Sequence, residues 1–523
     1  MATVIDKNQK SGFSKKETLT LNFVEGDLES LSPYSLSLCL RGRALGKWLF
    51  EGLTRLSPCG SYKPAGARKI TISPCQTSYL FALRPMRYSD GSFVSAYDYE
   101  RAWKGVLSSD VDCKQAGLFD CLKNAKAVRE KGKAISEVGV KALNQNTLLV
   151  ELERPNTYFL SLLSSCLFVP YKTKFGKVLF NGPYQVDEWE RDRYLRLTIN
   201  SFFQEQDTLE IKQIKILMVK NHQEVFSLYK RKELDWIGDP FCPLPKDRLS
   251  LELVQGKWTR KEVVRPFWIH LNTQHFPLSS PLIRRAFSCA VNRKWLSEHI
   301  YPGCRPLSTV LPKALSLYGE GNALCQDTGQ GETLFEEGLK ELRLTRKTFP
   351  LLKLSCCPME RNQKLAEYLK EKWETTFGIT IDLDIQDCRV FLENLRVGKF
   401  QIGGCFVSSD YKDALTLLAR LAAVDNCCHW NHFHYRDIVA CIEREKKPHI
   451  RCSLIRAAES ILIQEAPVIG LLNQTLNYIH RDDLHNLTFD YAGVPDLRWA
   501  RLSHSLNNPT FSDVGQKTKS IFS

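Results

Sequence analysis

The residues best suited to chemistry lie in one short segment, CCHWNHFHY, which holds Cys427, Cys428, His429, His432 and His434. Thiolates and neutral imidazoles are the ligands that zinc, copper and nickel favour in proteins. The spacing matches no closed structural zinc site, however, and the chain contains no C-x-x-C pair. We therefore interpret the segment as a polar loop with incidental histidines, and we predict neither a metal site nor any other cofactor.

The usual catalytic signatures are missing from the chain. The sequence contains no G-x-S-x-G, H-E-x-x-H or G-x-x-x-x-G-K-[ST], and no G-x-G-x-x-G opens a helix after a strand. The glycine-rich segment 319–332 lacks the lysine of a phosphate loop, so we interpret it as an exposed loop. These absences favour a protein that is not an enzyme.

The composition is that of an ordinary globular protein, with 43% hydrophobic and 25% charged residues among 523. A chain of this length exceeds what one hydrophobic core usually organises, so two or three lobes are expected. No run of about 18 uninterrupted apolar residues occurs, which argues against a membrane-spanning helix. The net charge of +14 is spread thinly and is not interleaved with aromatic residues, which argues against nucleic-acid binding.

Cysteine usage and the first residues bear on the compartment. The 18 cysteines are scattered, and many lie among apolar residues, which is typical of free buried thiols rather than of a disulfide scaffold. The first sixteen residues are polar and lack the apolar core of a secretion signal. As written, the chain carries no export signal, which leaves either a cytoplasmic protein or one whose leader has been removed or missed.

The elements that must position any site are clearest between residues 351 and 407. A short strand is followed by a helix whose apolar positions recur every four residues and which ends at Gly378. Residues 379–385 alternate as a half-buried strand, Asp387 can cap a second helix, and another strand starts at Phe400. Connections of this length predict a largely parallel sheet that is covered on its faces.

A second well-defined segment covers residues 87–107. Asp90 and Gly91 form a tight turn, and Ser95 with Asp98 forms a capping box that starts an amphipathic helix. Caps and apolar stripes of this kind fix a fold far more often than they bind a ligand.

The same segment resembles the stretch W-S-D-G-x-P-V-T-A-x-D-F-x-x-S-W of the extracytoplasmic solute-binding proteins of oligopeptide and dipeptide transport. The matching residues are Ser89, Asp90, Gly91, Val94, Ala96, Asp98 and Trp103. Further matches follow in family order, among them LFEGLTRL, FNGPYQVDEWERDRYL, KRKELDWIG and FQIGGCFVSSDYKDALTLL. Together they cover most of the chain, and the protein is identified as a member of this family.

The resemblance implies an α/β protein with the bilobal periplasmic-binding-protein fold of the large, three-domain type. Mixed sheets with flanking helices would enclose a ligand cleft between the lobes. The implied division is lobe I from residues 1–56, 180–265 and 466–510, a smaller accessory domain from 57–179, lobe II from 266–465, and a frayed tail from 511–523.

The resemblance also implies the function. The chain would be the substrate-binding component of a peptide ABC transporter, capturing short peptides in the cleft and delivering them to permease subunits in the membrane. It would act as a monomer in the periplasm or at the cell surface, without nucleic acid and without turnover. Two alternatives stay open: the same fold binding a metal chelate, haem or a sugar-like solute, or a cytoplasmic solute sensor.

Asp410, in SSDYKD, matches the family aspartate that accepts the α-ammonium group of the peptide. The resemblance places Val407, Ser408, Ser409 and Tyr411 on the same wall of the cleft, and Tyr34 with the strand that holds His270 on the opposite one. The positions that would anchor the peptide carboxylate hold His270, Asn362 and Gly404. A glycine cannot replace an arginine, so the preferred peptide length and sequence are not fixed by the resemblance.

Overall fold

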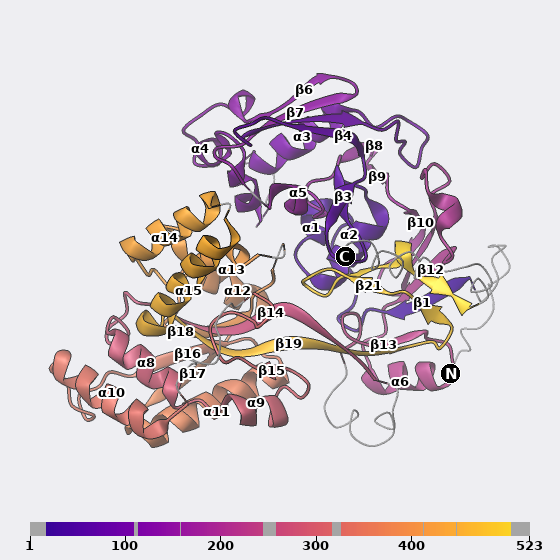
Figure 1. Cartoon of the computed structure of the whole chain (residues 1–523). Helices are drawn as coiled ribbons and strands as arrows, with labels where there is room; N and C mark the ends of the chain where they lie inside the picture. Colours follow the sequence, from indigo (N-terminus) through magenta and orange to yellow (C-terminus); the bar gives the residue numbers. More distant parts are fainter. Residues whose placement is uncertain are drawn as a thin grey trace, which may run out of the picture.

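The computed structural model describes residues 17–108, 113, 115–156, 158–243, 258–315, 326–409, 411, 413–445 and 447–503. Two lobes are joined by the long strands β14 (Thr259–Leu271) and β19 (Val468–His480), and a smaller accessory body around β4 to β7 lies above them in Figure 1. The α/β, bilobal fold that the resemblance implied is confirmed. The tail at 511–523 lies outside the described residues.

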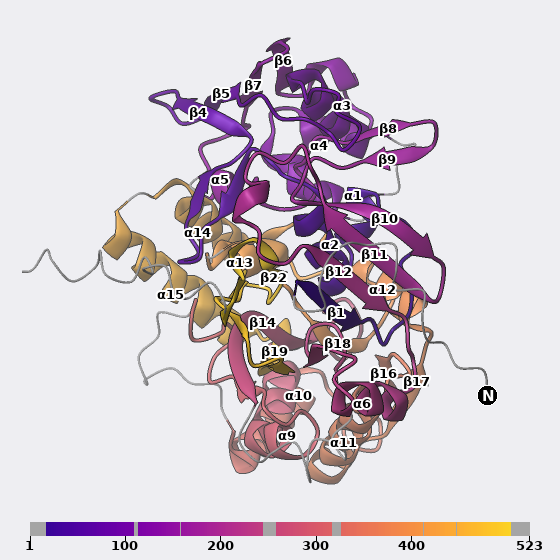
Figure 2. The same cartoon turned by 90° about the vertical axis from the view of Figure 1, so that its right-hand side faces the viewer.

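Lobe I is built on a mixed four-stranded sheet in the order β1-β12-β11-β10. Its strands are β1 (Thr18–Asn22), β12 (Gln213–Leu217), β11 (Tyr194–Ile199) and β10 (Tyr184–Glu190). Only the β1–β12 pair of this sheet is parallel. The helices α1 (Pro33–Leu36) and α2 (Leu40–Leu49) lie beside it in Figure 2 and close a core that includes Leu21, Trp48 and Ile214.

The accessory body is an antiparallel sheet in the order β4-β5-β7-β6, covered by α3 (Ala96–Leu107). The strands are β4 (Ala67–Ile72), β5 (Ser78–Leu83), β7 (Thr147–Glu151) and β6 (Val140–Asn144). Gly91 adopts a φ of 83° in the predicted turn, and the Asp98 carboxylate accepts the Ser95 N–H at 2.9 Å. The turn and the capped helix predicted for residues 87–107 are confirmed.

A seven-stranded sheet in the order β13-β19-β14-β18-β16-β17, with β15 paired to β19, extends from β13 in lobe I through the long strands into lobe II. The further strands are β13 (Trp236–Gly238), β15 (Arg305–Pro306), β16 (Leu352–Cys356), β17 (Ile381–Ile385) and β18 (Ile402–Phe406). β16, β17 and β18 are parallel, but β13, β14, β15 and β19 pair antiparallel. The prediction of a largely parallel sheet was therefore wrong for the sheet as a whole. The local βαβ pattern predicts the parallel strands but carries no information on the long strands that pair with them.

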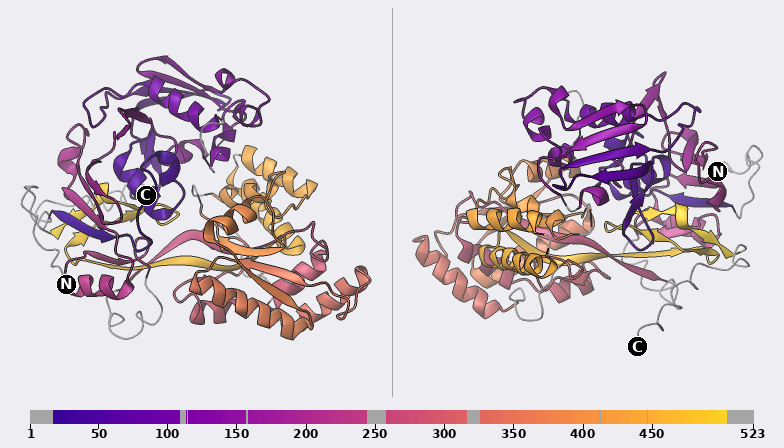
Figure 3. Two further views of the ribbon diagram at one scale, coloured as in Figure 1. Left: turned by 180° about the vertical axis from the view of Figure 1, so that it is seen from behind. Right: turned by 45° about the horizontal axis from the view of Figure 1, so that its top comes forward.

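Helices cover both faces of this sheet, as Figures 1 and 3 show. The lower layer is α8 (Pro281–Cys289), α9 (Arg293–His299), α10 (Thr328–Glu341) and α11 (Glu360–Phe377). The other layer is α12 (Cys388–Arg396), α13 (Leu415–Ala422), α14 (Phe433–Arg444) and α15 (Pro448–Glu465). Along β14 the side chains alternate, so that Phe267 and Ile269 enter the core of the lower layer and Trp268 enters the other.

Local signals in lobe II were mostly read correctly. Gly378 ends α11 in the left-handed conformation at φ 64°, and the Asp387 side chain accepts the Arg389 N–H as the cap of α12. The exposed loop expected for 319–332 was wrong from Thr328 onwards, because Asp327 caps α10 by accepting the N–H groups of Gly329 and Gln330. Residues 319–325 lie outside the described part.

Shorter elements complete the described chain. They are β2 (Thr54–Leu56), β3 (Tyr62–Pro64), α4 (Ala125–Arg129), α5 (Phe159–Leu162), β8 (Lys172–Lys174), β9 (Lys177–Leu179), α6 (His222–Lys230), β20 (Leu484–His485), β21 (Thr488–Phe489), β22 (Pro495–Asp496) and β23 (Arg501–Leu502). All cysteines in the described ranges are free thiols. Within those same ranges, no helix combines the length and the apolar character that crossing a bilayer requires.

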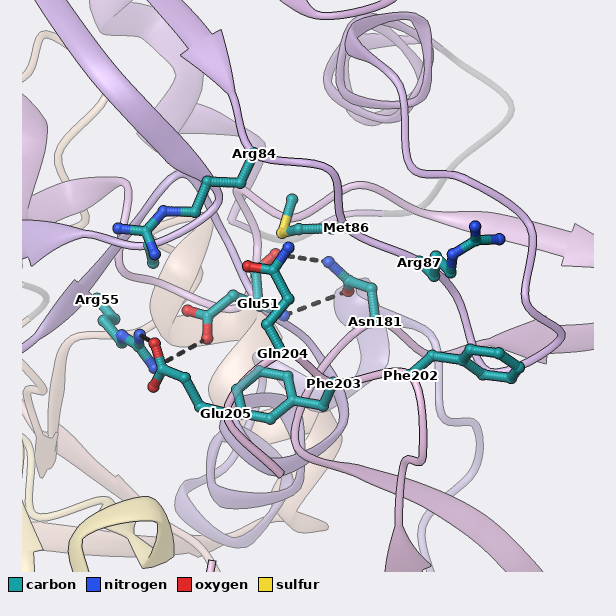
Figure 4. A pocket seen from close by; sticks show the side chains of 11 residues that line it. Glu51, Arg55, Arg84, Met86, Arg87, Asn181, Phe202, Phe203, Gln204 and Glu205 are labelled. Atoms are coloured by element: carbon teal, nitrogen blue, oxygen red, sulfur yellow. Dashed lines mark hydrogen bonds and ion pairs between the residues drawn. The ribbon is translucent and has the colours of Figure 1, made fainter. Parts of the chain in front are cut away.

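A buried ion network ties the C-terminal segment to lobe I. The Arg498 guanidinium pairs with Glu51 at 2.7 Å and with Asp496 at 2.7 Å, and all three side chains are at least 90% buried. Glu51 also meets Arg55 at 3.4 Å, and Arg55 pairs with Glu205, as Figure 4 shows. The cavity beside them, about 20 Å³, holds no more than a single water molecule.

We expect Arg498→Met to lower the free energy of unfolding by about 3–5 kcal/mol, because it leaves two buried carboxylates without their cation. Urea denaturation measures the loss. The matched control is Arg231→Met, which breaks the exposed Arg231–Glu233 pair and should change stability little. Equal losses in the two variants would contradict a special role for the network.

The same network predicts an acid dependence. Burial alone would raise the pKa of Asp496, but the Arg498 guanidinium lowers it below its ordinary value. A carboxyl group with a lowered folded pKa adds stability above its unfolded pKa, and this stability is lost as the pH falls through the folded pKa. The free energy of unfolding should therefore fall below about pH 4, and less steeply in Arg498→Met.

Candidate ligand site between the lobes

A cavity of about 530 Å³ lies between the accessory body and lobe II. One side is formed by the segment before and along α4, and the other by α12. Its lining residues are Cys113, Ala116, Gly117, Arg129, Arg389, Val390, Glu393, Asn394 and Arg396. The helix capped by Asp387 was predicted from the sequence, but neither its place in a cavity wall nor the segment before α4 was. The exposed Val390 and Leu392 are local signs that α12 has a second apolar face.

The cavity wall is rich in guanidinium groups. Arg129 pairs with Asp120 at 2.7 Å, and hydrogen bonding to that carboxylate raises the pKa of Arg129. Arg389 reaches across to Glu29 in lobe I, and Arg396 pairs with Glu393 at 2.6 Å on its own helix. These contacts fix the cations at the wall and link lobe I to α12.

The predicted wall from Val407 to Tyr411 directly continues β18. Val407 N–H donates to Pro266 O at 2.8 Å, and Ser409 N–H donates to Val264 O at 3.3 Å. The segment is thereby fixed to β14, and Ser409 is 2% exposed with a buried hydroxyl oxygen that has no partner among the described residues. Asp410 itself lies outside the described residues.

Tyr411 joins the two sides of the molecule. Its ring stacks on Tyr158 of the accessory body, with centroids 3.9 Å apart and planes within 4°. Burial raises the pKa of Tyr158 to about 12. A second contact nearby joins Arg154 to Glu443 of α14 at 3.1 Å. The structure therefore holds the accessory body against lobe II, with the cavity to one side of the contact.

Tyr34 lies in α1 at the boundary between lobe I and the accessory body. Its hydroxyl donates to Ala102 O at 3.4 Å, and its ring meets Tyr171 edge-on at 5.5 Å. Burial, then Tyr171 and then Cys113, a cavity residue, raise the pKa of Tyr34. Tyr34 thus lies close to Cys113, on the side of the cavity that the accessory body forms.

The predicted carboxylate-anchoring positions lie inside lobe II. His270 is 5% exposed on β14, and Asn362 accepts the Tyr301 hydroxyl at 2.6 Å and donates to the Cys357 sulfur at 2.7 Å. At Gly404 an added Cβ would lie 2.5 Å from the Ile269 side chain. None of the three lines the cavity between the lobes, and their role in binding stays a prediction.

Arg265, on β14, places another cation close to this wall. Its guanidinium donates to Gln474 at 2.7 Å and lies 5.3 Å from the Phe406 ring, while its Nε is buried with no partner in the described ranges. Burial, and then the nearby Arg43 from lobe I, lower the pKa of Arg265. A single arginine in the apolar run VVRPFWIHL was the signal that sequence reasoning overlooked.

The cysteine and histidine segment is split by the fold. His432 Nδ1 accepts the Tyr435 N–H at 3.1 Å and caps α14, whereas the His429 ring lies against Gly398. No set of three or more His, Cys, Asp or Glu side chains is placed to hold a metal ion in the part of the chain that the structure describes.

Comparison with known proteins agrees with this architecture. The model of bacterial extracellular solute-binding proteins, family 5 middle region, matches residues 61–426. The chain is 26% identical to the oligopeptide-binding protein OppA of Bacillus subtilis, over 91% of each chain. It is 25% identical to the dipeptide-binding protein DppE of the same organism, over 86% of each.

Two further similarities bear on ligand and fold. The probable deoxycholate-binding periplasmic protein YgiS of Escherichia coli is 24% identical over 84% of this chain and 86% of its own. The structure of the E. coli murein tripeptide binding protein MppA superposes with a TM-score of 0.80 at 20% identity, covering 94% of this chain and 99% of that one. Because the family model spans more than half of the chain, the protein belongs to the bacterial extracellular solute-binding proteins of family 5.

Proposed function

We propose that this chain is the substrate-binding component of a peptide ABC transporter, which captures short peptides between its lobes and delivers them to permease subunits in the membrane. The observation that carries the proposal is the cavity of about 530 Å³ between the accessory body and α12 of lobe II. Relatives named for oligopeptide and dipeptide binding support the ligand class.

The edge of β18 suits an extended peptide. β16 pairs with β18 at Ile402 and Gly403, and no described strand pairs with that edge beyond Gly403. Because Val407 and Ser409 donate their N–H groups to β14, the N–H of Ser408 points to the opposite edge, where the Arg420 guanidinium donates to Ser408 O at 3.1 Å. A peptide that adds to such an edge is held through its backbone, which permits many sequences.

The peptide ends need separate contacts. We assign the α-ammonium group to Asp410, with Tyr411, Ser409, Ser408 and Val407 forming the adjoining wall. Tyr34, His270 and Asn362 are proposed as further contacts that require side-chain movement on binding, since each is engaged with protein groups in this structure. Closure that brings Tyr411 onto Tyr158 would bury the ammonium–carboxylate pair and strengthen it.

A non-peptide solute is the second candidate, because YgiS, named for deoxycholate, is nearly as similar to the chain as DppE is. Native mass spectrometry of the purified protein separates the two. We expect co-purified masses that fragment as short peptides. A steroid, haem or metal-chelate mass in their place would overturn the peptide assignment and keep the binding-protein fold.

We expect Asp410→Asn to weaken binding of a tripeptide by roughly 10- to 100-fold, the loss of one charge-assisted hydrogen bond of about 1.5–3 kcal/mol. Titration calorimetry measures the affinity. Asp382→Asn, which changes an exposed aspartate of β17 in the same lobe, is the matched control. An N-acetylated tripeptide lacks the α-ammonium group, so it should bind equally weakly to Asp410→Asn and to the control variant. If Asp410→Asn binds the free tripeptide with normal affinity, Asp410 does not contact the α-ammonium group.

We expect Tyr158→Ala to weaken peptide binding by up to about tenfold, because the stack with Tyr411 is worth about 0.5–1.5 kcal/mol in the closed form. Small-angle scattering should show a larger radius of gyration for the unliganded variant. Tyr97→Ala removes an exposed ring from the same body and should leave both quantities unchanged. Unchanged affinity in Tyr158→Ala would mean that the stack does not contribute to closure.

A further inference from the structure

A pair of neighbouring thiols lies behind the proposed site. Cys427 and Cys428 follow α13, and their sulfur atoms are 4.0 Å apart. Cys427 also packs, together with Cys405 of β18, against the apolar cluster of Phe391, Leu395 and Phe400. Cys405 is two residues before Val407, so the thiols adjoin the strand that carries the ligand-binding edge.

The two thiols have different surroundings. Cys428 is fully buried, and burial raises the pKa of its thiol. A hydrogen bond from Cys428, and then the His270 ring, lower the pKa of Cys427, which is only half-buried. Cys427, the less buried thiol and the one beside His270, is thus placed as an attacking thiol, and the fully buried Cys428 as a resolving one.

His270 completes the arrangement. It is 5% exposed, its Nδ1 is buried without a hydrogen-bond partner among the described residues, and it acts on Cys427 through a hydrogen bond. His270 thus contacts the thiol pair in addition to being a proposed ligand contact.

The backbone around the pair is held firmly. Thr273 donates its N–H to Cys428 O at 2.9 Å and its hydroxyl to the same oxygen at 3.2 Å. On the other side, the Asn426 amide donates to Trp430 O at 2.7 Å. A bond between the sulfur atoms, which need to approach from 4.0 Å to about 2 Å, would strain this turn and the neighbouring Cys405 strand.

We propose that Cys427 and Cys428 are a redox-active dithiol, oxidised by peroxides, whose state alters the ligand-binding edge of β18. The Cys427 thiolate attacks a peroxide oxygen; the S–O bond forms, the O–O bond breaks, and the leaving oxygen departs as water after taking a proton. Cys428 then attacks the sulfenic sulfur; the S–S bond forms and the hydroxyl leaves as water with the Cys428 proton. Two thiols and hydrogen peroxide give one disulfide and two waters.

The chain offers internal controls. Cys59 and Cys75 are exposed, and hydrogen bonds from neighbouring hydroxyls lower the pKa of each thiol to about 7. Their sulfur atoms contact Ser57 and Ser61, and Ser73 and Thr77, respectively. They should react with peroxide but form no internal disulfide.

The test is peroxide treatment of the full chain, alkylation and tryptic mass spectrometry. The peptide Leu421–Arg436 contains both thiols and no other cysteine. We expect it to lose two hydrogen atoms, to escape alkylation, and to recover on reduction with dithiothreitol. Cys428→Ser should accumulate the sulfenic acid at Cys427, and His270→Asn should slow oxidation roughly tenfold. A peptide that stays doubly alkylated while the Cys59 and Cys75 peptides react would overturn the proposal.

The effect on binding rests on the proposed function and is measured separately. We expect the oxidised protein to bind a tripeptide at least several-fold differently from the reduced protein, and Cys428→Ser to show no such difference after the same treatment. Equal affinities would overturn the coupling. If even the reduced protein binds no peptide, the proposed function fails, while the mass measurement still decides the dithiol chemistry.

Discussion

The antiparallel pairing of β14 with β19 is the interaction on which the rest of the structure depends. Each strand has 13 residues, one end of the pair lies beside β13, and the other enters the sheet of lobe II. The register shifts between Glu262 and Pro266, and a proline donates no ladder hydrogen bond. The ribbon thus holds the two lobes together, and its ladder is interrupted between Glu262 and Pro266.

The same ribbon sets the ligand edge. Val264 and Pro266 supply the carbonyl groups that hold Ser409 and Val407, so a shift in this part of the ribbon would displace the proposed ligand wall. Tyr411, at the end of that wall, is buried, and its ring stacks on Tyr158 of the accessory body. The long strands, the proposed wall and the Tyr411–Tyr158 contact are thus directly connected.

Local signals predicted the local structure well. Gly378, Asp387 and the Ser95–Asp98 pair end or start helices through contacts within a few residues, and these contacts can be read from sequence. The antiparallel half of the sheet could not be predicted from the sequence, because β14 and β19 pair across some 200 residues with no local signature. The cavity walls were missed for the same reason: α12 and the segment before α4 meet only in the folded chain.

His270 shows why a residue that aligns with a family motif does not necessarily have the ligand-binding role of that motif. Residues of a strand alternate between its faces, so His270 shares the Trp268 side of β14, and Cys427 lies beside its ring. A family motif fixes which residue follows which, but the neighbours across the sheet decide what a side chain can contact. Here those neighbours are thiols, and burial leaves the imidazole Nδ1 unpartnered among the described residues. The same histidine that a motif assigns to a ligand is therefore equipped, by its packing, to act on sulfur.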